Sequence, residues 1–427
     1  MVIAAGGYGG QGFIVRLLGS APLSLIGRMS YSIYLWHWPL LAFMRYLGGD
    51  DLAWPSIAAA LVATAALSFL SWKYVETPFR VVKTAVDRRR AVGYACAASL
   101  AVLLLAVVIR SNNGFPNRFR RETLVTLDNL TFDKSFEYKG PHSRFHDAIG
   151  TETVGQHLLP IGKDGDLSRP DFLFWGDSHG MAVAAVIDKS AKTKGLVGCC
   201  ALRPGTPPLA GVWLPNCPEG ESRSRLTAGV FQAILEKRPK NVILCGKWSL
   251  YLAPKTRFGS DPWMADVGAS EATPETSRQA FVAGVHRVAK ACDSAGAKLW
   301  IMSEVPAQPS VSPKNRVIGA ALLGQELDFK GVTRDEYQLS QELWVEILRL
   351  IPPGIATIYD LSPAFFDEKG QSIVGRDGVQ WYSDKTHLNR IGAEAVLGTT
   401  IGHLMDEMTG QAATVGKETA AKERAGD

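Results

Sequence analysis

Two long apolar runs near the N-terminus constrain this chain most. They are residues 55–75 (PSIAAALVATAALSFLSWKYV) and residues 91–109 (AVGYACAASLAVLLLAVVI), and the second contains no charged side chain. Roughly 20 apolar residues are enough for a helix to cross a bilayer. A third candidate is residues 29–44 (MSYSIYLWHWPLLAFM), which is shorter and more aromatic. We therefore predict about three transmembrane helices before residue 110, and a water-soluble domain after it.

The positive charge of the chain is clustered rather than spread. The formal net charge is +5, and residues 80–90, between the second and third predicted spans, contain five lysines and arginines but one acid. Loops of this kind stay on the cytoplasmic side of a membrane. The cluster therefore predicts that residues 81–90 are cytoplasmic and that everything after Arg110 is extracytoplasmic. It indicates membrane orientation and no nucleic-acid partner.

Beyond residue 170 the sequence alternates between short apolar runs and helical patterns. Such alternation predicts a parallel sheet that is covered by helices on both faces. Residues 111–168 are punctuated by Gly, Pro and Asn and predict a linker or irregular extension, and residues 409–427 predict a disordered tail. The five predicted strands are 171–175, 196–202, 241–245, 298–303 and 356–359; the predicted helices lie near 180–193, 223–237, 275–295, 334–350 and 390–407.

A serine follows the first of these strands, and a histidine with a nearby acid follows the last. Ser178 stands at the carboxyl end of a strand and just before a helix, where ligands bind in open α/β sheets and where free backbone N–H groups favour an oxyanion. The alternative is that Ser178 only caps the helix. Asp384 and His387 are three residues apart on a loop, so the carboxylate can orient the imidazole as a base. We predict that Ser178 is the nucleophile and His387 the base.

The sequences Gly-Asp-Ser-His at 176–179 and Asp-Lys-Thr-His-Leu at 384–388 resemble the SGNH hydrolase superfamily. This resemblance implies an α/β, flavodoxin-like domain with a five-stranded parallel sheet. It also implies a triad of Ser178, His387 and Asp384, with Asp177 as a structural neighbour.

The family's oxyanion hole uses a glycine after the second strand and an asparagine after the third. By resemblance, Gly205 is the candidate glycine, and a simple turn is the alternative for it. No asparagine follows the third strand, where the chain reads Gly-Lys-Trp-Ser at 246–249. The Trp248 N–H or Lys247 is then the candidate substitute; otherwise the hole has two donors and hydrolysis is slower.

The first part of the chain resembles the end of the acyltransferase-3 membrane family. Residues 26–40 (IGRMSYSIYLWHWPL) are similar to its penultimate segment, and residues 76–80 (ETPFR) are similar to the end of its last helix. An interfacial belt of aromatic residues is the alternative. The family's membrane domain is longer and its essential histidine lies near its beginning, so His37 should not inherit that role. The resemblance implies a truncated or split gene product, or a partner polypeptide that supplies the other helices.

Together these resemblances imply an O-acyltransferase, and within that class an O-acetyltransferase, that modifies a cell-envelope polysaccharide. An esterase, or a non-catalytic membrane-tethered remnant that binds glycan, is the alternative. The expected location is the bacterial inner membrane, with several spans and a periplasmic C-terminal domain. We expect no metal or cofactor in the soluble domain, and acetyl-CoA or another acyl donor for the full membrane system. Membrane lipid is a further expected partner. The expected domains are a membrane-domain remnant (1–80), a loop and extra helix (81–110), an extension (111–168), the SGNH-like domain (169–408) and a tail (409–427).

The chain has six cysteines, and five of them follow the predicted membrane spans. SGNH domains fused to such membrane domains often carry a disulfide in this region. The resemblance therefore implies that Cys217 pairs with Cys199 or Cys200, with Cys200 as the preferred partner.

Overall fold

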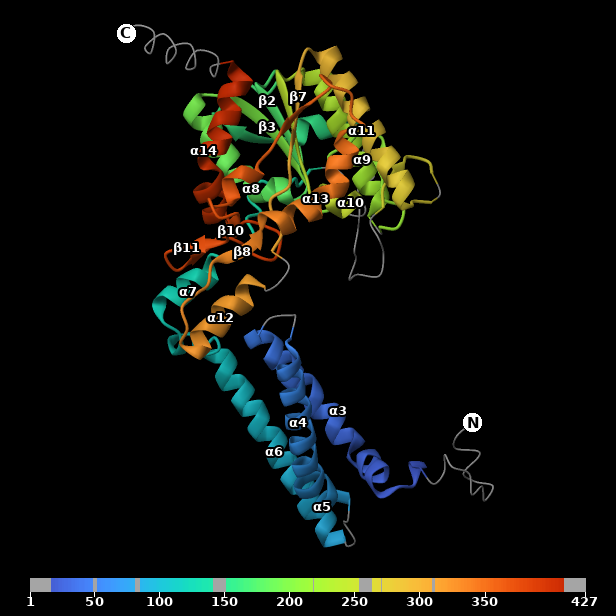
Figure 1. Cartoon of the computed structure of the whole chain (residues 1–427), viewed down its shortest axis with the longest axis vertical. Coiled ribbons are helices and arrows are strands. Elements are labelled where there is room, and N and C mark those ends of the chain that lie inside the picture. Colours follow the sequence, from blue (N-terminus) through green and yellow to red (C-terminus); the bar gives the residue numbers. More distant parts are fainter. Residues whose placement is uncertain are drawn as a thin grey trace. The chain divides into compact units, whose positions relative to one another are not determined.

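In the computed structural model, the chain forms two compact units. The described residues are 17–48, 52–80, 85–140, 151–217, 219–252, 263–269, 271–308 and 312–410. The predicted tail, 409–427, therefore lies almost wholly outside them, as do residues 81–84 of the basic loop. Labels follow Figure 1.

The first unit consists of helices in its described part (Figure 1). Helices α3 and α4 pack against each other, and α12 packs against α3. The apolar run at 55–75 becomes α4 followed by one turn of π-helix, and the run at 91–109 becomes most of α6. The elements are α3 (Ala21–Gly48), α4 (Trp54–Ser71), η1 (Trp72–Glu76), α5 (Thr77–Arg80), α6 (Ala85–Ser111), η2 (Pro116–Arg118) and α12 (Pro313–Leu323).

Two helical stretches of the described chain are long and apolar enough to cross a membrane, Trp54–Glu76 and Arg89–Ser111. Residues 29–44, the first predicted span, do lie in helix α3. That helix falls short of the same measure because its serines, aromatic residues and the flanking Arg28 and Arg45 lower its hydropathy. Three spans were predicted, and two candidates are found.

The second unit is built on a six-stranded sheet with the order β1-β3-β2-β5-β7-β9. Five strands are parallel, and each of them overlaps one of the five predicted runs. The prediction of a five-stranded sheet was wrong by one strand, because β1 adds antiparallel to β3 at the edge. The strands are β1 (Leu159–Gly162), β2 (Phe172–Gly176), β3 (Val197–Leu202), β5 (Asn241–Cys245), β7 (Lys298–Met302) and β9 (Thr357–Tyr359).

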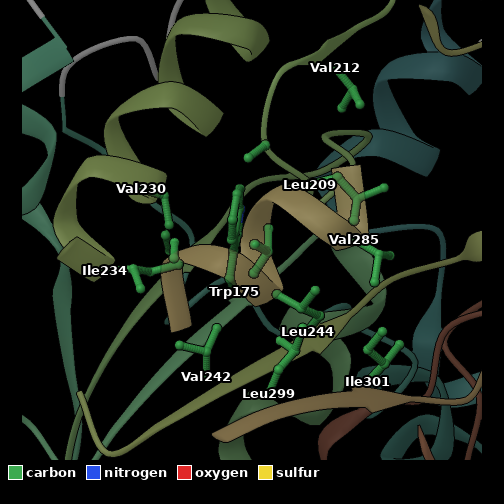
Figure 2. Packing of buried hydrophobic residues seen from close by; sticks show 14 of the residues in the cluster. Trp175, Leu209, Val212, Val230, Ile234, Val242, Leu244, Val285, Leu299 and Ile301 are labelled. Atoms are coloured by element: carbon green, nitrogen blue, oxygen red, sulfur yellow. The ribbon is translucent and has the colours of Figure 1, made fainter. Parts of the chain in front are cut away.

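The sheet is covered by helices on both faces. Alternate residues of β2 point to opposite sides, so Leu173 and Trp175 join one apolar cluster while Phe172 and Phe174 join the other. Helices α9 and α11 supply the first cluster, part of which is drawn in Figure 2, and α8 and α14 supply the second. Every residue of β2 and β5 is buried, as expected for central strands of a covered parallel sheet. The helices are α8 (Ser178–Lys194), α9 (Gly220–Lys237), α11 (Pro274–Ala295) and α14 (Arg390–Thr409).

Smaller elements complete the second unit around this sheet. Three pairs of short strands, β4–β6, β8–β10 and β11–β12, lie outside it. The remaining elements are α7 (Arg121–Asp128), η3 (Thr151–His157), β4 (Val212–Trp213), α10 (Trp248–Leu252), β6 (Ala265–Asp266), β8 (Lys330–Thr333), α13 (Arg334–Leu348), η4 (Ser362–Phe365), β10 (Gln371–Ile373), β11 (Gly375–Arg376) and β12 (Val379–Gln380). Strand β1 and helix η3 both lie in the stretch for which we predicted a linker or irregular extension.

All six cysteines are free thiols, so the predicted disulfide at Cys217 is wrong. The preferred partner, Cys200, faces the α8–α14 side of the sheet, whereas Cys217 packs against the cluster on the α9–α11 side. Cys199 faces the same side as Cys217 but is fully buried in β3. The alternation of side chains along β3 therefore separates Cys200 from Cys217 by the thickness of the sheet.

Candidate active site

The nucleophile candidate lies where strand β2 passes directly into helix α8. Asp177 is the N-cap of that helix, and its carboxylate accepts a hydrogen bond from the His179 backbone N–H at 2.7 Å. Ser178 is thus the first residue of the helix and not its cap, which removes the alternative role considered for it. The free N–H groups of this first turn leave a partial positive charge beside the Ser178 hydroxyl.

The base candidate is held by a tight loop before helix α14. The Ser383 N–H donates to the His387 carbonyl at 2.9 Å, and Tyr382 and Leu388 form a bridge that closes the loop. Asn389 then caps α14 by accepting from the Gly392 N–H at 2.8 Å. These contacts fix the backbone on both sides of the imidazole.

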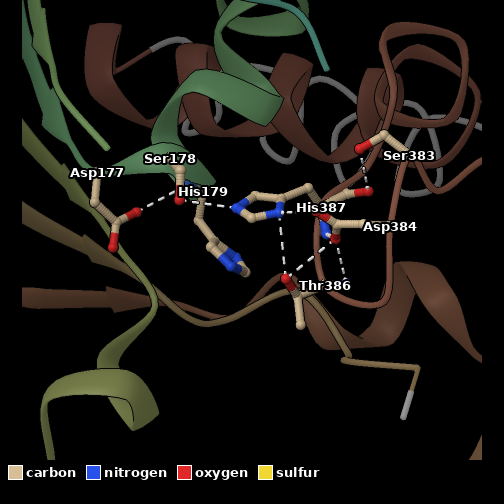
Figure 3. A network of polar contacts seen from close by, with 7 residues as sticks. All are labelled: Asp177, Ser178, His179, Ser383, Asp384, Thr386 and His387. Carbon is tan, nitrogen blue, oxygen red and sulfur yellow. Dashed lines mark hydrogen bonds and ion pairs between the residues drawn. The ribbon is translucent and has the colours of Figure 1, made fainter. Parts of the chain in front are cut away.

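The two loops bring Ser178, His387 and Asp384 together, as Figure 3 shows. The Ser178 Oγ lies 2.8 Å from His387 Nε2, and His387 Nδ1 lies 2.7 Å from Asp384 Oδ2. A carboxylate beside Nδ1 keeps the proton on that nitrogen and leaves Nε2 as the acceptor for the Ser178 hydroxyl proton. This chain of hydrogen bonds can activate a serine for attack on an acyl carbonyl.

Asp384 is kept ionised by its surroundings. Partial burial by itself would raise its pKa, but hydrogen bonds from His387 and from two backbone N–H groups hold the pKa below the usual range of an aspartate. Those N–H groups belong to Thr386 and His387, at 2.7 and 2.8 Å from Oδ1. The carboxylate is thus both anchored to its own loop and directed at the imidazole.

The lowered pKa of Asp384 leads to a pH prediction. A depressed folded-state pKa means that the carboxylate stabilises the fold above its unfolded-state pKa of about 3.9, and that this stabilisation is lost as the pH falls further. We expect the melting temperature of Asp384→Asn to be below that of the wild type near about pH 6, and the difference to shrink toward about pH 3. Ser383→Ala is the control, since its difference should not vary with pH. A constant difference for Asp384→Asn would contradict the prediction.

Gly205, the candidate oxyanion glycine, follows strand β3, which lies directly beside β2 in the sheet. Its φ of +62° favours glycine, and its carbonyl accepts a hydrogen bond from Arg223. Both loops leave the same edge of the sheet because β2 and β3 are parallel. Gly205 is thus part of a specific turn at that edge, and its role as an oxyanion donor stays a prediction.

The Trp248 indole does not fit the role considered for it. Its N–H donates to the Met302 carbonyl at 2.8 Å, and its ring is fully buried and stacked on Trp344 with centroids 5.5 Å apart. An indole that already donates within the core is not free to bind an oxyanion. The Lys247 backbone N–H is also used, since it donates to Asp177 at 2.9 Å. Of the candidates that we considered, this leaves the Trp248 backbone N–H and the Lys247 side chain.

Lys247 lies in a cluster of buried ionisable groups. Burial lowers the pKa of Lys247, while the negative charges of Glu304, Asp177 and Asp384 act to raise it. Burial raises the pKa of Glu304 to about 7, against the hydrogen bonds that it accepts from Ser249. The positive charge of Lys247 therefore favours the ionised form of Glu304, whereas the negative charge of Asp177 opposes it.

Asp177, which the resemblance implied to be only a structural neighbour, is the centre of a further hydrogen-bond network. Besides the His179 and Lys247 N–H groups, its carboxylate accepts from the Tyr251 hydroxyl at 2.9 Å. It thereby joins the start of α8 to the loop after β5. Burial raises the pKa of Asp177, and the three donors act in the opposite direction.

Two aromatic rings contact the His387 imidazole. The His179 ring lies 4.7 Å from it and the Phe132 ring 4.9 Å from it, measured between centroids. His179 is buried, and burial holds its pKa well below the usual value, so it stays neutral beside His387. Phe132 lies in the predicted linker, and no pattern in the sequence indicated that its side chain contacts the active site.

Comparison with known proteins identifies the family of the chain. A family-wide sequence profile described as "SGNH domain (fused to AT3 domains)" matches residues 143–399, more than half of the chain. The chain belongs to this SGNH family. A second profile, described as "Acyltransferase domain", matches residues 1–73. The SGNH domain thus follows an acyltransferase segment, in the order that the two resemblances implied.

The relatives of this SGNH protein align with it over short segments. "O-acetyltransferase OatA" of Staphylococcus aureus (strain NCTC 8325 / PS 47) is 37% identical over 67 residues, which is 15% of this chain and 11% of the relative. "Peptidoglycan O-acetyltransferase OatA" of Listeria monocytogenes is 32% identical over 71 residues, or 16% and 11%. The chain thus spans about a tenth of the length of these relatives.

The solved structures that are similar to this SGNH protein include the periplasmic domain of a lipopolysaccharide acetyltransferase from Salmonella ser. Paratyphi A. The two share 14% identity with a TM-score of 0.40, over 55% of this chain and 84% of that one.

Proposed function

We propose that this protein transfers an acyl group, most simply acetyl, to a hydroxyl of a cell-envelope polysaccharide by way of an acyl-Ser178 intermediate. The observation that carries the proposal is the unbroken hydrogen-bond chain from Ser178 through His387 to Asp384. The match to an acyltransferase profile supports the class of reaction, and so do the names of the relatives, which are called O-acetyltransferases.

The proposed reaction has two steps, acylation of Ser178 and transfer of the acyl group to the acceptor. In the first, Ser178 Oγ attacks the acyl carbonyl while His387 Nε2 accepts the hydroxyl proton; the leaving group departs with that proton, and the serine becomes acylated. In the second, an acceptor hydroxyl gives its proton to His387 and attacks the acyl-serine, and Ser178 Oγ leaves with the proton. The N–H groups at the start of α8, with Gly205 and Lys247 as further candidates, would stabilise the oxyanion of both steps.

The proposal includes the setting of the reaction. The basic residues at 80–90 favour a cytoplasmic loop, which would place the SGNH domain on the periplasmic side of a bacterial inner membrane. The acyl donor, acetyl-CoA or another, would then be used by the membrane part of the system. The domain bounds given above are part of the same proposal.

Hydrolysis is the second candidate, and one observation favours it. The Asp384 side chain is 54% exposed, so solvent reaches the outer end of the triad. Water could then replace the sugar hydroxyl in the second step, and the protein would be an esterase. The two functions share the acyl-enzyme and differ in how it is consumed.

Trapping the nucleophile tests the proposal. The full-length protein in detergent is treated with a serine-directed fluorophosphonate, and the labelled peptide is identified by mass spectrometry. We expect a single label on Ser178 and none in Ser178→Ala. Ser383→Ala is the matched control, since it removes a serine of the same site whose hydroxyl only contacts the His387 carbonyl. A folded wild-type protein that takes no label, or takes it elsewhere, would favour a non-catalytic glycan-binding role. Adding oligosaccharide acceptors to the acetylated enzyme then separates transfer from hydrolysis.

A further inference from the structure

The segment 130–138 precedes the residues that match the SGNH profile, which begin at 143. It has little regular structure, yet it is held at several points. The Asp133 carboxylate accepts from the Ser135 N–H at 2.9 Å and from the Ser135 hydroxyl at 2.6 Å, which forms a local turn. The segment follows α7, whose Thr126 hydroxyl donates to the Gly378 carbonyl at 2.8 Å.

The far end of the segment is attached to the sheet. The Tyr138 N–H donates to the Leu202 carbonyl at 2.7 Å, and Glu137 forms a parallel bridge with Leu202. Leu202 is the last residue of β3 and lies three residues before Gly205. Tyr138 itself is buried in the apolar cluster on the α9–α11 side. The segment is therefore fixed beside the sheet edge from which the Ser178 loop also leaves.

Between these attachments, the segment contacts the base. Phe132 and Phe136 both pack against the apolar cluster that includes Tyr382 and Leu388, the residues that close the His387 loop. Only Phe132 of these two has a ring contact with His387, at 4.9 Å between centroids and 59° between planes. The imidazole is 19% exposed, much less than the 54% of its Asp384 partner.

The His387 imidazole has to keep two hydrogen bonds aligned at once, one to Ser178 and one to Asp384. A hydrogen bond weakens steeply when its angle departs from linear, so a small rotation of the ring would weaken both. Asp384 orients the imidazole through one hydrogen bond, but it is half exposed on a surface loop, and a single bond does not by itself stop the ring from rotating about it. Contacts of ring against ring can, because aromatic pairs have preferred geometries.

We propose that the 130–138 segment, through the Phe132 ring, is a positioning element of the active site that holds the His387 imidazole in line with Ser178 and Asp384. This inference rests on the proposed function. It means that the catalytic unit begins before the SGNH match, in a stretch that the sequence indicates only as a linker. Phe132 acts through His387 and touches no reacting atom.

The test uses the full-length protein in detergent and three variants, Phe132→Ala, Phe132→Tyr and Phe136→Ala. One readout is the rate of fluorophosphonate labelling of Ser178. The other is the rate at which diethyl pyrocarbonate modifies His387, followed by peptide mass spectrometry, which does not depend on serine chemistry. Phe136→Ala is the matched control, because it removes the same kind of side chain from the same segment and cluster, whereas the ring contact with His387 in the described structure is that of Phe132.

We expect Phe132→Ala to slow labelling about tenfold and Phe132→Tyr to remain within about twofold of the wild type, as for the loss and retention of one aromatic contact. His387 should be modified faster in Phe132→Ala alone. Phe136→Ala should lower the melting temperature but leave both rates within about twofold. Normal labelling in Phe132→Ala, or equal slowing in Phe136→Ala, would overturn the positioning role. A wild-type protein that takes no label at Ser178 would overturn the proposed function and, with it, the positioning role. Faster modification of His387 in Phe132→Ala would in that case show only that the Phe132 ring covers the imidazole.

Discussion

His387→Ala and Ser178→Ala are each expected to lower kcat for an activated acetyl ester by about 10⁶-fold, since triad members act as a unit. His387 Nε2 is the only acceptor that the described structure places on the Ser178 hydroxyl, so its loss leaves the serine unactivated. Asp384→Asn should lose less, about 10⁴-fold, because it alters the orientation and tautomer of the imidazole but leaves a base in place. Initial rates with the purified full-length protein give the measurement.

Thr386→Val is the control for this series. The Thr386 hydroxyl lies 3.2 Å from His387 Nδ1 and also contacts Asp384, so it is a second polar neighbour of the same nitrogen. We expect a loss of about threefold or less, as for one peripheral hydrogen bond. Near-normal activity in Asp384→Asn together with a large loss in Thr386→Val would reassign the orienting role to the threonine.

Asp177→Ala is expected to cause the largest loss of stability among the site variants. The change would leave two backbone N–H groups and the Tyr251 hydroxyl without their acceptor, in a region where the aspartate is 1% exposed. At about 1–3 kcal/mol for each unsatisfied donor, we expect a loss of about 3 kcal/mol or more in the free energy of unfolding. The expected drop in melting temperature is about 6–12 °C.

A conservative variant and an exposed aspartate complete this experiment. Asp177→Asn should also be destabilising, because an amide NH₂ would face donors on one side. Asp166→Ala removes a carboxylate that likewise accepts from a backbone N–H and a hydroxyl, both of Ser168, but in an exposed turn. Its effect on the melting temperature should be far smaller than that of Asp177→Ala, because substitutions in exposed turns change stability little. If the Asp177 and Asp166 variants melt at the same temperature, the buried network does not stabilise the domain.

The parallel strands could be predicted from their apolar runs, most clearly at β2 and β5, whose residues are all buried as in a sheet covered on both faces. Strand β1 could not, because Leu159–Gly162 contains Pro and Gly and is stabilised by its pairing with β3 and not by its own pattern. The triad residues were predictable for a related reason. Ser178 stands at the start of a helix, and Asp384 and His387 lie in the loop before the last helix, so their positions follow once the order of the elements is known.

Other parts of the site depend on contacts that are distant in sequence. The indole of Trp248 donates to Met302, 54 residues away, and no local pattern distinguishes this from a donor that faces the site. Phe132 precedes His387 by 255 residues (387 − 132) and lies in a stretch of sequence without periodicity. The pairing of Cys217 failed because a local resemblance does not specify which face of β3 a thiol occupies.

The burial of thiols in the apolar clusters on both faces of the sheet has a chemical consequence. Burial raises the pKa of Cys199 to about 12 and that of Cys292 likewise to about 12, and it raises the pKa of Cys200 and Cys245 as well. Thiol oxidation and disulfide exchange proceed through the thiolate, and almost none forms at these sites near neutral pH. The fold itself therefore protects these four sulfur atoms from oxidants, and in an oxidising compartment they would persist as small apolar side chains of the core.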